Sequence, residues 1–197
     1  MKKLVAILVI LSSLSFHNNE VDEELMAVLV SSESSLEING STNLNTFNCT
    51  LNFEAIDAIV TTNYFKNGNK INFRNTALKL ENNCFDCGNR MMNKDFRKML
   101  NSDVYPYVTL ELQEIAVNPL NRKEVYAYTI ISMAGVSKTY SIPLNVQFES
   151  RIDVTGCLSL KLTDFGITPP RKALGFIMVS NDFDINLDLR IEPLNQN

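Results

Sequence analysis

The sequence predicts an all-β protein with antiparallel strands, closed as a barrel or folded as a sandwich. Several segments alternate apolar and polar residues, so each has one apolar face, whereas a helix would scatter those residues around its circumference. Turn sequences such as Lys66-Asn67-Gly68-Asn69 separate the segments. No helical crossover is predicted between them, which favours antiparallel connections. The alternation by itself does not separate a barrel from a sandwich.

The chain begins with the pattern of a secretory signal peptide. Lys2 and Lys3 precede an unbroken apolar run from Leu4 to Leu11, and small serines follow. The run is about half as long as the roughly 20 residues that a membrane-spanning helix needs. We therefore predict a cleaved signal peptide over residues 1–16, a linker leading to the first strand over 17–34, and one folded domain over 35–197. Such a protein is expected to be periplasmic or secreted.

Five later segments carry the clearest alternation. Their apolar positions are Leu36 and Ile38; Val108, Leu110 and Leu112; Leu144, Val146 and Phe148; Leu158, Leu160 and Leu162; and Ile185, Leu187, Leu189 and Ile191. Less regular strands are predicted over 49–58, 71–80, 125–133 and 138–142. Turn residues at 118–121 and 134–137 fall between these segments. The domain is thus predicted to consist mainly of strands.

Residues 89–100 form the one convincing helical segment. Asn93 is predicted to cap it, and Met92, Phe96, Met99 and Leu100 are spaced to share one face. A helix with one apolar face is expected to pack against the sheet as a lid or plug. The alternative is a mobile gate over the mouth of a ligand site.

The composition argues against several functional classes. The net charge is -4, whereas nucleic-acid-binding proteins usually present a basic surface. His17 is the only histidine and lies at the predicted cleavage junction, so the domain lacks imidazole as a general base or metal ligand. The sequence has no nucleophile elbow, phosphate-binding glycine loop or dinucleotide fingerprint. We therefore predict a protein that is not an enzyme and uses no cofactor or metal.

The cysteines Cys49, Cys84, Cys87 and Cys157 are disulfide candidates, because the chain is predicted to be exported. Four cysteines allow three connectivities, which the sequence does not separate. Cys84-Phe85-Asp86-Cys87 also has the spacing of a redox or metal half-site, although its asparagine- and glycine-containing flanks are typical of a loop. The alternatives are structural or unpaired cysteines, a disulfide to Cys49 or Cys157, and a thiol-active pair.

Several motifs, in one order, resemble the YceI-like family of lipid-binding or polyisoprenoid-binding proteins. The matching segments are 35–47, with its glycine turn followed by Phe47; the short helix 92–100; the tyrosine-proline strand start 105–110; the hairpin Gly135-Val136-Ser137-Lys138; the strand exit Asp164-Phe165-Gly166-Ile167; and the last strand 185–191. The sequence departs from the family at three places. Ala134 replaces a histidine, Thr163 replaces an arginine, and Val104 with Tyr105 replaces a pair of aromatic residues.

The resemblance implies a lipocalin-like antiparallel β-barrel of about eight strands with one short helix. It also implies an apolar partner, such as an isoprenoid or fatty acyl lipid, inside the barrel, with peripheral membrane contact possible and no nucleic acid bound. The alternative is a filled barrel that serves as an envelope interaction or stress protein without a lipid.

The predicted apolar lining comprises Leu36, Ile38, Phe47, Val108, Leu110, Leu112, Val146, Phe148, Leu160, Phe165, Ile185 and Leu187. The candidates for contact with a ligand head group are Arg97, Lys138 and Arg171. Arg171 and Lys172 follow two prolines that stiffen their loop.

Overall fold

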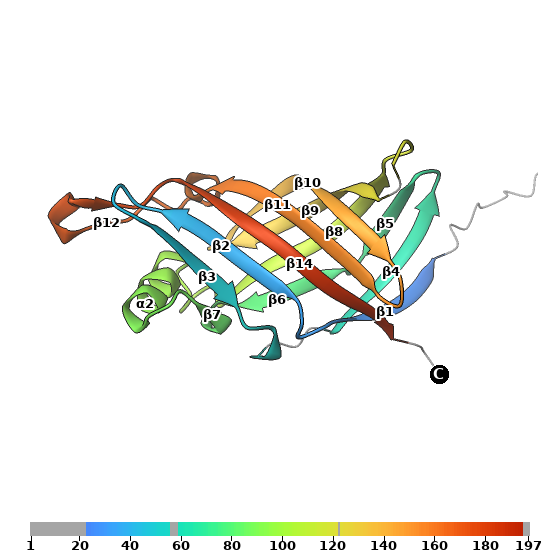
Figure 1. Cartoon of the computed structure of the whole chain (residues 1–197), viewed down its shortest axis with the longest axis horizontal. Coiled ribbons are helices and arrows are strands. Elements are labelled where there is room, and N and C mark those ends of the chain that lie inside the picture. The colour runs from blue at the N-terminus through green and yellow to red at the C-terminus, as the bar shows by residue number, and fades with distance from the viewer. Residues whose placement is uncertain (1–22, 56–58, 122, 195–197) are drawn as a thin grey trace, which may run out of the picture.

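Antiparallel strands close into a barrel in the computed structural model, which describes residues 23–55, 59–121 and 123–194 (Figure 1). The strands are β1 (Glu24–Val30), β2 (Ser35–Ser41), β3 (Thr46–Leu51), β4 (Ile59–Asn67), β5 (Lys70–Arg74), β6 (Ala77–Glu81), β7 (Phe85–Asp86), β8 (Tyr107–Val117), β9 (Glu124–Met133), β10 (Val136–Phe148), β11 (Ile152–Lys161), β12 (Arg171–Lys172), β13 (Ile177–Met178) and β14 (Asp182–Leu194). The helices are α2 (Arg90–Met99) and the 3-10 turns η1 (Phe53–Ala55), η2 (Asn82–Cys84), η3 (Leu162–Phe165) and η4 (Ala173–Gly175). The predicted signal peptide lies outside the described residues.

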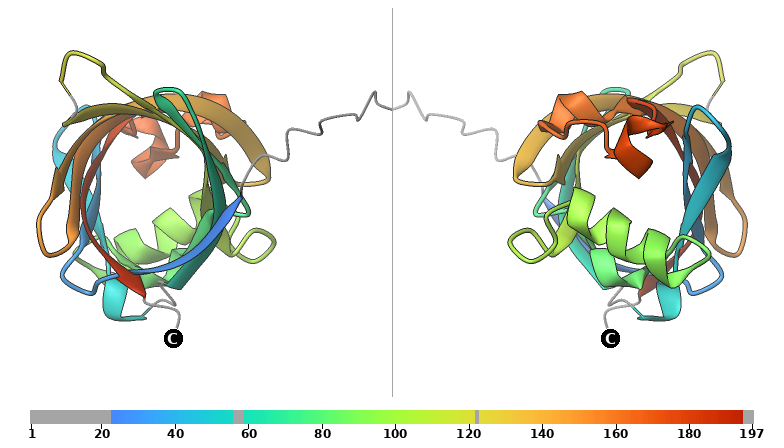
Figure 2. Two further views of the ribbon diagram at one scale, coloured as in Figure 1. Left: turned by 90° about the vertical axis from the view of Figure 1, so that its right-hand side faces the viewer. Right: turned by 90° about the vertical axis from the view of Figure 1, so that its left-hand side faces the viewer.

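Eight of these strands form a ring, in the order β1, β4, β5, β8, β9, β10, β11 and β14. The ring closes because β1 pairs with β14 as well as with β4. The first half of β14 pairs instead with β2, and β3 and β7 extend the sheet from there. Viewed end-on, the strands surround a common axis and α2 lies across one end (Figure 2). The predicted antiparallel barrel with one short helix is confirmed.

The N-terminal part of the fold differs from the prediction. Residues 24–30 are not a linker, because they form β1, the strand that closes the ring. Strand β4 was not predicted, and the strand predicted over 49–58 ends at Leu51. The strand predicted over 71–80 is divided at Asn75, whose φ of 59° is in the left-handed region. Strand β10 joins two predicted segments without a break.

Strand β8 shows how the inward face is kept along a long strand. Leu112 lies opposite Thr129, and Glu114 opposite Tyr128, so a bulge inserts an extra residue at Gln113. Beyond the bulge, Ile115 lies opposite the buried Ala127. A bulge shifts the alternation by one residue, and this shift returns the apolar residues of β8 to the barrel interior.

Helix α2 is anchored by asparagine side chains. The N-cap is Asn89, not the predicted Asn93, since the Asn89 Oδ1 accepts a hydrogen bond from the Met92 amide at 3.0 Å. Asn93 instead accepts from the Cys87 amide at 2.6 Å and donates to Asp86 at 3.0 Å. The hydrogen bonds that Asp86 accepts from Asn93 and from the Gly88 amide lower the pKa of its carboxyl. No helix within the described residues is long and apolar enough to cross a membrane.

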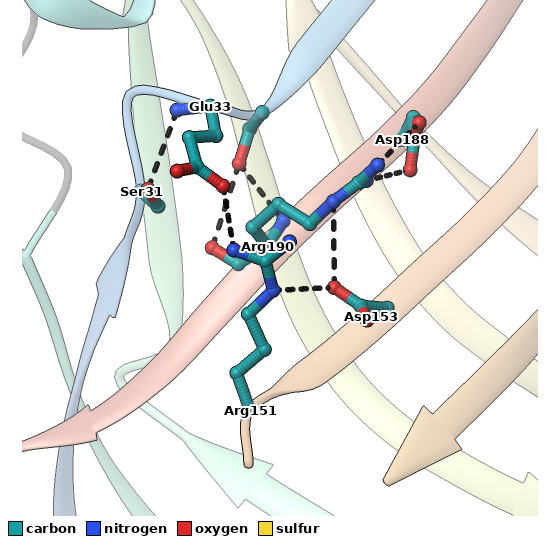
Figure 3. Close-up of polar contacts among 7 residues, drawn as sticks. Ser31, Glu33, Arg151, Asp153, Asp188 and Arg190 are labelled. Carbon is teal, nitrogen blue, oxygen red and sulfur yellow. Dashed lines mark hydrogen bonds and ion pairs between the residues drawn. The ribbon is translucent and has the colours of Figure 1, made fainter. Parts of the chain in front are cut away.

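An ionic cluster holds the corner between β1 and β2 against the outside of the barrel (Figure 3). The Arg151 guanidinium lies 2.6 Å from Glu33 and 3.0 Å from Asp153. The Arg190 guanidinium contacts Asp188 and lies 3.4 Å from Asp153. The Arg190 amide also donates to the buried Ser34 hydroxyl at 2.9 Å. The cluster therefore fixes the point where β14 changes its partner from β2 to β1.

Candidate ligand cavity

The apolar interior at the α2 end contains two neighbouring cavities. Each has about 40 Å³ of space open to the centre of a water molecule, which is room for about three waters. They differ in total empty volume, counted with their openings to solvent, which is about 570 Å³ for the larger cavity and about 450 Å³ for the smaller one. The walls of the larger cavity are wholly apolar. Its lining residues are Leu36, Ile38, Leu80, Phe85, Leu100, Val108, Leu110, Ile131, Met133, Ile142, Leu158, Leu160, Phe183, Ile185 and Leu187.

The smaller cavity lies between α2, the β2–β3 hairpin and the segment that enters β14. Its lining residues are Ile38, Gly40, Phe47, Cys49, Phe96, Met99, Leu100, Met133, Leu162, Val179, Ser180, Asp182 and Phe183. Four residues line both cavities and form the wall between them: Ile38, Leu100, Met133 and Phe183. Leu100, which follows α2, and Met133, the last residue of β9, thus separate two halves of one apolar space.

Most residues of the predicted lining lie in these walls. The larger cavity contains Leu36, Ile38, Val108, Leu110, Leu160, Ile185 and Leu187, and the smaller one Ile38 and Phe47. Leu112 lies opposite the buried Thr129 and so shares its inward face. Val146 belongs to a second apolar cluster with Val125 and Val154. Phe165 is buried in the main core, outside both sets of lining residues.

Phe148 is wrong as a lining residue, because its side chain is 71% exposed at the end of β10. The prediction also missed wall residues from β6, β9 and α2, among them Leu80, Ile131, Met133 and Phe96. The sequence contained an alternating pattern that could have identified Ile131 and Met133. Every second residue of β9 is buried, namely Val125, Ala127, Thr129, Ile131 and Met133. The threonine and alanine in this series weaken its apolar pattern.

Two glycines of the matching motifs make room for aromatic rings, one across the β2–β3 hairpin and one between distant segments. A Cβ atom added to Gly40 would lie 2.5 Å from the ring of Phe47, so the glycine makes room for that ring. Gly135 has a φ of +83°, and an added Cβ there would lie 2.5 Å from the ring of Tyr105. The glycine-phenylalanine and tyrosine-proline motifs are therefore parts of close contacts between segments.

Tyr140 and Asp164 form a polar contact beside the core. The Tyr140 hydroxyl donates to Asp164 Oδ2 at 3.2 Å, and the Tyr140 ring packs 6.2 Å from the ring of Phe165. Burial and the neighbouring Asp164 charge raise the pKa of Tyr140 to about 12. Its neutral form is thus stabilised in the folded protein, and this contribution is complete below the ordinary pKa of 10.0 and is lost as the pH rises through about 12.

We expect a spectrophotometric titration of the tyrosines to show this high pKa. The chain has six tyrosines, and the Tyr140→Phe variant should lose the component that ionises near pH 12. Tyr126→Phe, at an exposed site on β9, is the matched control and should leave that component unchanged. The hydrogen bond to Glu24 also raises the pKa of Tyr64, so the component from Tyr64 should remain in both variants. An amplitude near pH 12 that is unchanged in Tyr140→Phe would contradict the assignment.

The three head-group candidates lie on elements at one end of the barrel. Arg97 is on α2, Arg171 is on β12, and Lys138 is near the start of β10, just after the hairpin whose glycine contacts Tyr105. Arg97 is half-buried, and the other two are exposed. Within the described part of the chain, His, Cys, Asp and Glu form no group of three or more that could hold a metal ion.

The four cysteines divide into one disulfide and two free thiols. Cys49 and Cys87 are joined, with Cα atoms 4.0 Å apart, and both are buried. Cys84 and Cys157 are free. Burial and Glu81 raise the pKa of the Cys84 thiol, which disfavours the reactive thiolate. The thiol-active alternative therefore has no support, because Cys87 is paired across the sheet with Cys49.

Known proteins share this fold without close sequence similarity. No family model and no curated protein matches the sequence. A polyisoprenoid-binding domain from Saccharophagus degradans, implicated in plant cell wall breakdown, is similar at a TM-score of 0.62 and 16% identity, over 87% of this chain and 100% of that one. BcnA from Burkholderia cenocepacia is similar at a TM-score of 0.55 and 15% identity, over 83% and 99% of the two chains.

The YceI protein of Campylobacter jejuni is a third structure of this kind. It is similar at a TM-score of 0.51 and 13% identity, over 67% of this chain and 74% of that one. The resemblance inferred from the ordered motifs is thus confirmed in three dimensions. The chain has the barrel fold of the YceI-like proteins.

Proposed function

We propose that this protein is an exported, non-enzymatic binding protein that holds a long apolar ligand, an isoprenoid or another lipid, inside its barrel. The observation that carries the proposal is the wholly apolar wall of the larger cavity. Five ring strands (β8, β9, β10, β11 and β14) supply this wall, together with β2, β6, β7 and Leu100. An apolar chain would gain about 0.8 kcal/mol for each methylene group buried there. The polyisoprenoid-binding domain that shares the fold supports an apolar ligand in general.

The volume of the cavities sets a condition on binding. A space for about three waters is too small for a long chain, so the two cavities have to join and widen. Their common wall includes Met133, and Met99 lies beside it on α2. Methionine side chains are unbranched and change shape at low cost. We therefore expect the ligand to displace Met133 and Leu100 and to occupy both cavities as one channel.

The function is tested by native mass spectrometry of the protein purified from its source, followed by lipid extraction. The expected result is a bound hydrophobic mass. An Ile185→Phe substitution fills the larger cavity from a half-buried wall position and should reduce occupancy by about tenfold, the equivalent of about two lost methylene contacts. Asn186→Phe, on the exposed face of the same strand, is the matched control and should keep the ligand.

The small cavity volume also favours a second candidate, a filled barrel that recruits another protein without binding lipid. The same experiment separates the two. Repeated absence of a bound mass from the source protein, or equal occupancy in the two phenylalanine variants, would contradict the lipid-binding proposal. In that case the apolar space is simply the core of the fold.

A further inference from the structure

The hairpin formed by β12, η4 and β13 projects from the barrel end that carries α2 (Figure 1). Its tip is apolar and lies in solvent, with Leu174 101% exposed and Phe176 77% exposed. Leu44, in the adjoining β2–β3 turn, is also exposed. Large apolar side chains that gather on one projection mark a surface that meets another apolar phase.

The fold holds this tip in place. The Asn43 side chain donates to the Phe176 carbonyl at 3.0 Å and accepts from the Met178 amide at 2.8 Å. Ala173 and Leu174 have φ values of 50° and 58°, in the left-handed region that non-glycine residues rarely adopt. Unfavourable backbone conformations persist where the surrounding structure maintains them. The exposure of Leu174 is therefore a property of an ordered hairpin.

Helix α2 and the hairpin both carry an excess of basic side chains, although the whole chain has a net charge of -4. Helix α2 carries four basic side chains and one acidic side chain, Asp95, while the hairpin carries two basic side chains and none that is acidic. Lys172 lies 2.6 Å from Asp95, so an ion pair joins the hairpin to the helix. Apolar residues that project beyond a basic surface are complementary to a bilayer with anionic head groups.

We propose that this end of the barrel docks on an anionic lipid bilayer. Leu174, Phe176 and Leu44 enter the interface, and the basic residues of α2 and β12 face the lipid phosphates. The smaller cavity lies directly behind the tip, since Gly40 and Val179, which line it, flank the two turns that form the docking surface. Docking is independent of any ligand in the barrel, so it can be tested whether or not the protein binds a lipid inside.

The absence of tryptophan from the chain gives a direct test. A Leu174→Trp variant reports on the tip, and a Leu120→Trp variant is the matched control. Leu120 is 95% exposed in the β8–β9 turn, at the opposite end of the barrel from α2 (Figure 1). Each variant of the full chain is mixed with vesicles of phosphatidylcholine alone or of phosphatidylcholine and phosphatidylglycerol in equal amounts. Lipids brominated in the acyl chains serve as quenchers.

The expected result is a blue-shifted and quenched emission for Leu174→Trp on the anionic vesicles, with little change for Leu120→Trp. Salt at about 0.5 M should weaken binding at least tenfold by screening the basic surface. A Leu174→Ser substitution in the Phe176→Trp background should weaken binding about tenfold through the lost apolar contact. Equal responses of the two reporters, or no response of Leu174→Trp while its circular dichroism stays native, would overturn the proposal.

Discussion

Removal of the Cys49–Cys87 disulfide should lower the free energy of unfolding by about 4 kcal/mol. The bond closes a chain segment with a sequence separation of 38 and joins β3 to the residue that follows β7. Its main effect is to reduce the conformational freedom of the unfolded chain, which grows with the length of the loop. Urea unfolding of the Cys49→Ala, Cys87→Ala double variant against the oxidised wild type measures the difference.

The two free thiols provide the matched control. A Cys84→Ala, Cys157→Ala double variant keeps the disulfide and should unfold within about 1 kcal/mol of the wild type, since Cys157 is exposed and Cys84 is only partly buried. Alkylation of the unfolded, unreduced wild type should label two cysteines. Labelling of all four, or equal stability of the two double variants, would contradict this pairing.

The sequence did not predict which cysteines pair, and the reason is physical. Cys49 faces Cys87 because β3 pairs with β7 in the register Thr50 to Asp86 and Leu51 to Phe85. Strand β7 has only two residues, and so short a strand has no alternation to recognise. The position of Cys87 therefore depends on contacts between distant segments, and the adjacent Cys84 of the same motif remains unpaired.

The same reasoning separates the strands that were predicted from those that were missed. Strands β11 and β14 alternate clearly, because one face is inside the barrel and the other is in water. Strand β1 has no such pattern, since Leu25 and Leu29 point away from the face that carries the buried Val30. Its role becomes visible only in its pairing with β4 and β14. Closure of the ring is a property of long-range pairing.

The residues around the cavities were predicted to the same extent as the strands. Eight of the predicted lining residues lie in the cavity walls. Seven of them do so because their alternation fixes the inward face of β2, β8, β11 and β14, and the eighth, Phe47, is on β3. The wall residues at the α2 end, Phe96, Met99 and Leu100, lie on the predicted apolar face of the helix. Alternation gives no information about which inward residues surround empty space and which fill the core.

Two phenylalanines that the sequence placed on the same inward surface should differ sharply in their effect on stability. Phe165 is 1% exposed and packs against Tyr140 within the main core, so Phe165→Ala should lower the free energy of unfolding by about 3–5 kcal/mol. Phe148→Ala removes the same ring from an exposed site and should change it by about 0.5 kcal/mol or less. Urea unfolding of both variants against the wild type measures the two effects.

The contrast follows from the position of each residue along the barrel axis. Phe148 lies two residues after the buried Val146 and therefore points to the same face of β10. It is the last residue of the strand, however, and lies beyond the side chains that cover the interior. Phe165 lies in the 3-10 turn η3, which folds back over the core, with Leu162 buried beside it. The odd or even position of a residue along a strand fixes the face to which its side chain points. Burial also requires neighbouring side chains at the same level along the barrel axis. Similar losses of stability in the two variants would show that the rim around Phe148 is covered in solution.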